Sequence, residues 1–290
     1  MEVREIVLDA LHRKTAIPAF NIPYLPMVEP VAAAIADENT TAIIQVARAE
    51  WEKFSAKSLE DVAREYHKHE KPGFTILGLD HVPVIDEDFK KVDYRAIIER
   101  AIGVGYKYVL LDGSRLDIEG NISATKEIAD MAHSAGLACE GELGAVMGHE
   151  SGPVKPYEEI FQSRLGFTDL DEAKRFAAET GCDWLSVAAG NIHGAIAEAT
   201  RHQKKPAARL DIGHIENLFK AAGVPLVLHG GSGIPFDYVK RGIAAGIAKV
   251  NIGAEIRQAY ENCMEETGGK VTAAQERVYK RVRELITDIL

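Results

Sequence analysis

The sequence has few cysteines, and they form no recognisable metal or redox motif. Cys139, Cys182 and Cys263 are the only three in 290 residues, and no Cys-x-x-Cys pair is among them. This pattern excludes a zinc ribbon and a disulfide framework, and it is typical of proteins in a reducing compartment. We therefore expect a cytoplasmic protein.

Long apolar runs and an excess of positive charge are also missing. No run is long enough to span a membrane, and Glu2, Glu5 and Asp9 interrupt the first residues where a signal peptide would be apolar. The 34 Lys and Arg residues are outnumbered by 44 Asp and Glu, which gives a formal net charge of -10. We therefore expect no membrane partner and no nucleic-acid partner, although a local anion site is not excluded.

What the sequence does contain is a regular alternation of short apolar runs and helical patterns. The predicted strands cover residues 16–20, 42–46, 74–79, 108–111, 137–142, 184–188, 226–228 and 249–252. The helical patterns between and after them cover residues 27–37, 58–69, 94–102, 123–135, 168–180, 215–222, 236–245 and 254–290. This alternation predicts an α/β protein, a (β/α)8 TIM barrel with a C-terminal helical extension. An open doubly wound sheet is the alternative, but no Gly-x-Gly-x-x-Gly turn follows Phe20.

Capping residues, glycines and prolines predict where helices, loops and the domain begin and end. Ser58 with Asp61, and Thr168 with Asp171, predict two helix N-termini, and Gly268 with Gly269 predicts a break in the C-terminal helix. No Pro- or Ser-rich linker divides the chain, so residues 1–290 are predicted to form one domain that includes the helical tail from about residue 254. The segment 148–166 lacks periodicity and is predicted to be a loop over the barrel mouth, with 195–206 a second candidate.

Polar residues gather where the predicted strands end. In a barrel these ends face one shared pocket. The set is Asn21, Asp80, His81, Asp112, Ser114, Glu142, Asn191, His193, His229, Ser232 and Asn251. It contains three histidines from three different strands, and three imidazoles are a common ligand set for catalytic zinc. A single histidine on a loop would usually be only a solvated side chain.

Asp80 and His81 are neighbours at one strand end. Adjacent strand residues point in opposite directions, so both side chains reach the pocket only if the strand bends. A bend would place the Asp80 carboxylate near a metal-bound substrate, where it could carry a proton; otherwise Asp80 is only a helix cap.

Two glycine-rich turns follow neighbouring strands. They are residues 190–194, Gly-Asn-Ile-His-Gly, and residues 230–233, Gly-Gly-Ser-Gly. Barrels often bind phosphate near the loops after the seventh and eighth strands. A metal beside a phosphate site predicts a phosphorylated sugar as the substrate.

Taken together, these motifs resemble the class II, metal-dependent ketose-bisphosphate aldolases, the family of fructose- and tagatose-bisphosphate aldolases. The similarity runs from about residue 19 to residue 257. It consists of the segments 19–21, 79–81, 112–114, 140–144, 190–194, 228–233 and 250–253, in the family's order and at similar spacing.

The resemblance implies a reaction and roles. His81, His193 and His229 would hold a divalent ion, most often zinc, with Glu142 as an alternative ligand. Asp80 would carry the proton of the substrate's C4 hydroxyl during carbon–carbon cleavage.

The resemblance also implies further contacts and an assembly. Glu150 would transfer a proton at the enediolate. The dihydroxyacetone phosphate end would be bound by Asn21, Gly194, Gly230, Ser232 and Asn251, with a monovalent cation as a possible helper. Family members are commonly homodimers or homotetramers of carbohydrate metabolism, glycolysis included.

The chain departs from the family pattern at Gly78, where members often have His before the Leu-Asp-His segment, and two further departures concern the substrate. Ala47 stands where many members have Ser, and Ala254 where they often have Thr. One interpretation is an aldolase for fructose- or tagatose-1,6-bisphosphate. The alternative is a related aldolase for a modified sugar-acid phosphate or a singly phosphorylated ketose. A metal-dependent hydrolase on the same barrel is a third, but it would need a His-x-His pair where the first strand has Ala19-Phe20-Asn21.

Overall fold

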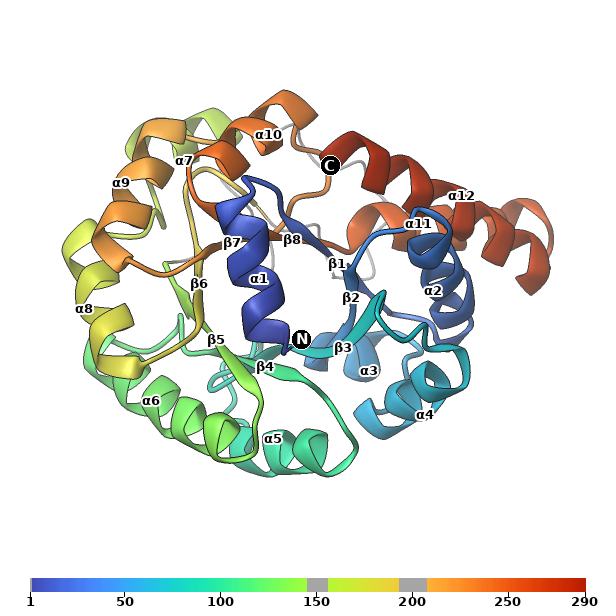
Figure 1. Cartoon of the computed structure of the whole chain (residues 1–290), viewed down its shortest axis with the longest axis horizontal. Helices are drawn as coiled ribbons and strands as arrows, with labels where there is room; N and C mark the ends of the chain where they lie inside the picture. Colours follow the sequence, from blue (N-terminus) through green and yellow to red (C-terminus); the bar gives the residue numbers. More distant parts are fainter. Residues whose placement is uncertain (1, 145–155, 193–207) are drawn as a thin grey trace.

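The protein is a closed parallel barrel, as the strand pattern predicts. The computed structural model describes residues 2–144, 156–192 and 208–290. Eight strands pair in sequence order, and β8 returns to β1 (Figure 1). They are β1 (Ile17–Asn21), β2 (Ala42–Ala47), β3 (Thr75–Pro83), β4 (Tyr108–Asp112), β5 (Ala138–Leu143), β6 (Trp184–Val187), β7 (Leu226–Leu228) and β8 (Ile247–Ile252).

Helices surround the barrel. They are α2 (Val28–Asp37), which follows the short 3-10 helix η1 (Leu25–Met27), α3 (Arg48–Lys53), α4 (Leu59–His69), α5 (Tyr94–Gly103), α6 (Ile118–Ser134), α7 (Tyr157–Ser163), α8 (Leu170–Thr180), α9 (Ile212–Ala222), α10 (Phe236–Ala244), α11 (Ala254–Glu266) and α12 (Val271–Ile289). No helix within the described residues is long and apolar enough to cross a membrane.

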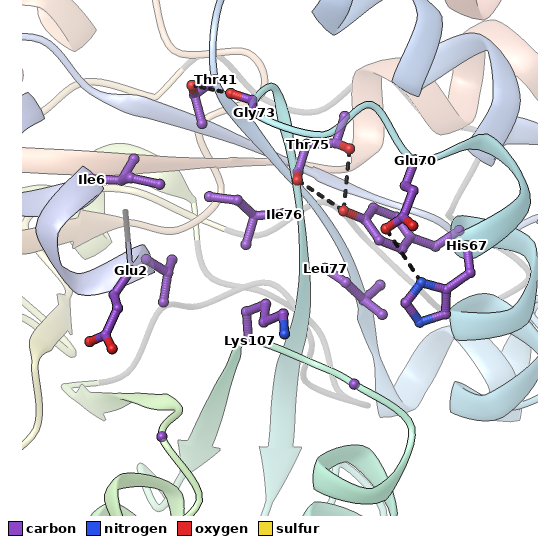
Figure 2. A pocket seen from close by; sticks show the side chains of 14 residues that line it. Glu2, Ile6, Thr41, His67, Glu70, Gly73, Thr75, Ile76, Leu77 and Lys107 are labelled. Atoms are coloured by element: carbon purple, nitrogen blue, oxygen red, sulfur yellow. Dashed lines mark hydrogen bonds and ion pairs between the residues drawn. The ribbon is translucent and has the colours of Figure 1, made fainter.

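The first helix closes the N-terminal end of the barrel. In Figure 1, α1 (Val3–His12) lies across the centre of the ring of strands. Its buried residues Val3, Val7 and Ala10 recur on one helical face and join the apolar cluster inside the barrel, which includes Tyr108 and Trp184. A cavity of about 510 Å³ opens at this end, lined by Ile6 and Ile76 among others (Figure 2). The polar residues at the strand ends lie at the other end of the barrel, so the site is expected there and not at this cavity.

The C-terminal extension packs on its own chain. Helix α12 lies against α11 and against α2 (Figure 1). Val278, Val282 and Leu285 are buried there, and Tyr279 donates a hydrogen bond to Asp37 (2.6 Å). Its exposed apolar side chains include Val271 and Leu290, near the two ends of the helix.

Three local expectations need correction. Part of the segment expected to be a loop is helix α7, and α3 and α1 were not expected. The cap of α8 is Asp169, whose carboxylate accepts from the amides of Asp171 and Glu172. Thr168 instead donates its hydroxyl to the carbonyl of Leu143 (2.6 Å) and accepts from the amide of Ala188 (2.9 Å), so it ties the end of β5 to the end of β6. The Ser58 cap is confirmed, because its hydroxyl accepts from the Asp61 amide.

Candidate active site

A bulge in β3 turns two adjacent side chains toward the same pocket. The register between β3 and β4 shifts between Leu79 and Val82, and His81 has a positive φ of 30°. Non-glycine residues rarely adopt such a conformation, and strained backbone of this kind is found at active sites as well as in turns. The bend therefore solves the problem that strand alternation sets for Asp80 and His81.

Asp80 is held from both sides by side-chain amides. It is only 2% exposed, and its two oxygens accept from Asn21 Nδ2 (2.9 Å) and Asn251 Nδ2 (3.0 Å). Gln45 Nε2 in turn donates to Asn21 Oδ1 (2.9 Å). Burial would raise the pKa of Asp80, but the charges of His81, His229 and Lys249 together with the Asn21 bond lower it. Asp80 is therefore an ionised, oriented carboxylate rather than a helix cap.

Two imidazoles and two carboxylates form the centre of the pocket. His81 Nδ1 lies 3.2 Å from Asp112 Oδ2 and 3.3 Å from Glu142 Oε2. His229 Nδ1 lies 3.5 Å from the same Glu142 oxygen, and the two histidine rings are 4.6 Å apart between centroids. Asp112 is fixed by the amide and hydroxyl of Ser114 (3.0 and 2.6 Å). Residues from β3, β4, β5 and the end of β7 thus converge on one point.

Proton affinities in this cluster are strongly perturbed. Burial, with the nearby charge of Asp112, raises the pKa of Glu142 well above its ordinary value. Burial alone would lower the pKa of His81, but Glu142, Asp80 and Asp112 outweigh it and raise that pKa well above its ordinary value. The pKa of His229 is lowered by burial and by the charge of His81. A cluster that holds protons so close together can exchange them for a divalent cation.

The donor set fits such a cation. One ligand atom each from Asp80, His81 and His229 lie within 4.8 Å of one another, and the same holds for His81, Asp112 and Glu142. Imidazole with carboxylate is a ligand chemistry that zinc and several other divalent metals accept. Glu142 Oε2 is buried and makes no well-aligned hydrogen bond within the described residues, but it faces Nδ1 of His81 and of His229 at 3.3 and 3.5 Å, an arrangement that a shared cation would satisfy.

The glycine-rich turn after β7 lies beside the end of β8. The amide of Gly231 donates to the carbonyl of Asn251 (3.1 Å), and a side chain at Gly231 would meet that carbonyl and Val250. Ser232 is buried, and its hydroxyl accepts from the amide of Glu255 (3.4 Å). The turn that contains Gly230 and Ser232 therefore lies beside Asn251, and the predicted role of these residues in substrate binding stays a prediction.

Three predicted site residues lie outside the described residues. They are Glu150, His193 and Gly194. Their roles stay predictions.

One carboxyl group near the pocket was missed by the sequence analysis. Glu50 of α3 reaches back to the end of β2, where its Oε2 accepts from the amide of Ala47 (2.7 Å), and it also binds the side chain of Asn21. Burial, with a contribution from the charge of Asp80, raises the pKa of Glu50 to about 8. Its position three residues beyond a strand end was the available signal.

A layer of charged and aromatic side chains directly beneath the site was also missed. Glu140, Lys249 and Trp184 meet inside the barrel, with Tyr108 and Gln45 beside them. Glu140 precedes Glu142 by two residues, and Lys249 precedes Asn251 by two, so each lies on the same strand face as a predicted site residue. That spacing was the only sequence signal.

The family model for class II fructose-bisphosphate aldolases matches the whole chain, residues 1–290. The chain belongs to the class II fructose-bisphosphate aldolase family. The family's name describes aldolases of a phosphorylated sugar, and its class II members are metal-dependent.

Individual relatives agree with this assignment. A fructose-bisphosphate aldolase of Streptococcus pyogenes is 38% identical over 166 residues, which are 57% of this chain; the chain spans about half the length of that relative, 51%. A 6-phospho-5-dehydro-2-deoxy-D-gluconate aldolase of Bacillus subtilis is 31% identical over 90% of this chain and 81% of its own length. The crystal structure of the YdjI aldolase from Escherichia coli K12 is 28% identical, with a TM-score of 0.77 over 99% of this chain and 96% of that one.

Proposed function

We propose that this class II aldolase family member reversibly cleaves a phosphorylated ketose to dihydroxyacetone phosphate and an aldehyde. The observation that carries the proposal is the bulge at His81, which places an ionised, doubly hydrogen-bonded Asp80 beside the cluster of His81, His229 and Glu142. Our first substrate candidates are fructose- and tagatose-1,6-bisphosphate.

The ligands proposed for the metal are His81, His193 and His229, with Glu142 as an alternative. Zinc is the proposed ion, and a bound divalent ion would supply Lewis acidity at the substrate's ketone oxygen.

Asp80 is the proposed base for cleavage. Its carboxylate accepts the proton of the C4 hydroxyl as the C3–C4 bond breaks, so that C4 leaves as the aldehyde and the electron pair stays on C3. Asn21 and Asn251 keep both oxygens of Asp80 in place. Glu150 is proposed to return a proton to C3.

The phosphorylated end is proposed to bind near the turn after β7. Gly194, Gly230 and Ser232 are the proposed contacts, with a monovalent cation as an additional helper. Asn251 Oδ1 is buried and has no hydrogen-bond partner within the described ranges, which supports a contact to a substrate hydroxyl. Asn21 has both amide atoms engaged by protein groups, so we expect it to position Asp80 and to contact substrate less directly.

A second candidate is an aldolase for a modified sugar-acid phosphate or a singly phosphorylated ketose. Two observations favour it. The Bacillus subtilis relative, named for a phosphorylated deoxygluconate, matches 90% of this chain. Ala47, which offers no hydroxyl, pairs in register with Asp80 at the mouth of the barrel. We further propose one domain, a cytoplasmic location and a homodimer or homotetramer.

The deciding experiment is a retro-aldol screen of the zinc-loaded protein. Fructose- and tagatose-1,6-bisphosphate, their 1-phosphates and a sugar-acid phosphate would be tested, with dihydroxyacetone phosphate detected by a coupled reductase. Asp80→Asn should lower kcat with the preferred substrate at least 100-fold. Full activity after exhaustive chelation, or in Asp80→Asn, would refute the proposal; activity confined to the singly phosphorylated or acidic sugars would establish the second candidate.

A further inference from the structure

One carboxylate inside the barrel has no part in the chemistry proposed above, yet it contacts a proposed metal ligand. Glu140 lies on β5, and its side chain is fully buried. Its Oε1 lies 2.8 Å from Nε2 of His229. Its Oε2 accepts from Lys249 Nζ and from Trp184 Nε1, both at 2.7 Å. Four neighbouring strands, β5 to β8, thus supply or directly precede the residues of one closed contact set.

The charges in this set balance. A lone carboxylate or ammonium in such an interior would be very unfavourable, but Glu140 and Lys249 compensate each other, and the face of the Tyr108 ring lies 4.8 Å from Lys249 Nζ. Trp184 adds a neutral donor that fixes the direction of Oε2. Because Oε2 is occupied twice, Oε1 is directed at His229.

This arrangement sets the orientation of the His229 ring. A carboxylate oxygen accepts, so Nε2 of His229 carries the proton and Nδ1 is the nitrogen that offers a lone pair. Nδ1 is also the nitrogen that faces Glu142 Oε2, at 3.5 Å. Hydrogen bonds of this kind fix both the tautomer and the ring plane of metal-binding histidines, and their loss typically costs 10- to 100-fold in metal affinity.

We propose that Glu140 is a positioning residue that presents Nδ1 of His229 to the metal, and that Lys249 and Trp184 hold Glu140 in place for this task. The inference rests on the proposed metal-dependent function, but it concerns metal binding and not turnover. It assigns a role to a Glu–Lys–Trp set whose members are not among the proposed substrate contacts.

The test compares metal affinity in matched variants. Glu140→Gln alone leaves Lys249 without its counter-charge and so risks misfolding; Glu140→Gln/Lys249→Met keeps the layer neutral, and Trp184→Phe removes one donor without changing charge. The control is Asp183→Asn. Asp183 is also a mostly buried carboxylate bonded to a histidine, His133 Nε2 at 2.9 Å, but it lies at the opposite end of the barrel.

The readouts do not depend on activity. Zn²⁺ dissociation constants would be measured by competition with a chromophoric chelator. The visible absorption spectrum of each Co²⁺-substituted protein would report the geometry of the metal site. ¹⁵N-histidine NMR of the metal-free protein would report the His229 tautomer, assigned with His229→Asn. We expect the double variant to bind Zn²⁺ 10- to 100-fold more weakly and Trp184→Phe at least threefold more weakly, both with altered Co²⁺ spectra, while Asp183→Asn stays within twofold of the parent.

The results separate this inference from the proposed function. Folded variants with unchanged Zn²⁺ affinity and Co²⁺ spectra, or a His229 whose proton resides on Nδ1, would overturn the inference. A parent protein that binds no divalent metal would overturn it together with the metal-dependent mechanism. Weakened metal binding in a protein that releases no dihydroxyacetone phosphate would support the positioning role while refuting the proposed substrate class.

Discussion

Replacing Gly78 with alanine tests how the barrel interior below the site is packed. Gly78 of β3 pairs in register with Tyr108 of β4. A Cβ at position 78 would lie 2.7 Å from Cζ and 2.8 Å from Cδ1 of the Tyr108 ring, and closer still to Cε1. Carbon atoms in contact are about 3.5–4.0 Å apart, so the ring would have to move by about 1 Å or more. Tyr108 is fully buried, donates its hydroxyl to Gln45 and packs on Trp184, so it has little room.

The expected cost follows from these contacts. Overpacking a core costs about 1–3 kcal/mol, and weakening the Tyr108–Gln45 hydrogen bond adds about 1 kcal/mol. Alanine in a strand recovers about 0.5–1 kcal/mol relative to glycine through the unfolded chain. We therefore expect Gly78→Ala to lower the free energy of unfolding by about 2–3 kcal/mol.

A double-mutant cycle in urea is the assay. Tyr108→Leu removes the ring that clashes, at a cost of about 2–4 kcal/mol for the lost volume and the unpaired Gln45. The double variant Gly78→Ala/Tyr108→Leu should then be more stable than the sum of the single effects by about 2 kcal/mol. A cost below 1 kcal/mol for Gly78→Ala, or effects that add within 0.5 kcal/mol, would refute the packing argument.

Other consequences concern the mouth of the barrel. Glu50 has a pKa raised to about 8, so the folded protein holds a proton that the unfolded chain releases above about 4.5, and stability should fall as pH rises between these values. For one such group the free energy of unfolding can fall by at most about 1.4 kcal/mol per pH unit, and less here because the Glu50 side chain is partly exposed. In urea titrations at pH 6 and pH 9, the free energy of unfolding of Glu50→Gln should therefore fall by about 1–2 kcal/mol less than that of the parent protein. An equal fall in both proteins would contradict this. Asp80→Asn should lower kcat at least 100-fold with little change in KM. A large rise in KM with kcat unchanged would indicate a role in substrate binding instead. Chelation should lower the midpoint of thermal unfolding, and Zn²⁺ should restore it; a midpoint indifferent to both would argue against a metal site.

The barrel was predictable because its signal is repeated along the chain. Six of the eight short apolar runs end in or before a polar residue or a glycine, and an error of one or two residues in any strand leaves the count and the order unchanged. Helix α1 was missed although Val3, Val7 and Ala10 repeat at helical spacing, because it precedes the first strand and so lies outside the strand–helix alternation that predicts the other helices. Helix α7 was missed because it is short and lies in a segment rich in glycine and proline.

The site was predictable in part, and the division has a physical basis. Strand ends meet in any closed barrel, so His81, Asp112, Glu142 and His229 could be brought together from their positions alone. Glu140 and Lys249 are 109 positions apart in the chain, and nothing local identifies them as partners. A charged residue inside an apolar strand usually suggests an edge or an error in register, and only the closed barrel shows that the two charges compensate each other.

Gly78 connects the packing inside the barrel with the geometry of the site above it. Class II aldolases often carry histidine where this chain has Gly78, and the structure shows that the ring of Tyr108 occupies the space a side chain there would need. Tyr108 then connects the layer of Lys249 and Glu140 to Gln45, and through Gln45 to the amide of Asn21 that binds Asp80. The departure at position 78 is therefore compensated within the barrel, beneath the site. Because Asp80, His81 and His229 still converge above this layer, the glycine is better explained as repacking of the supporting layer than as loss of the site.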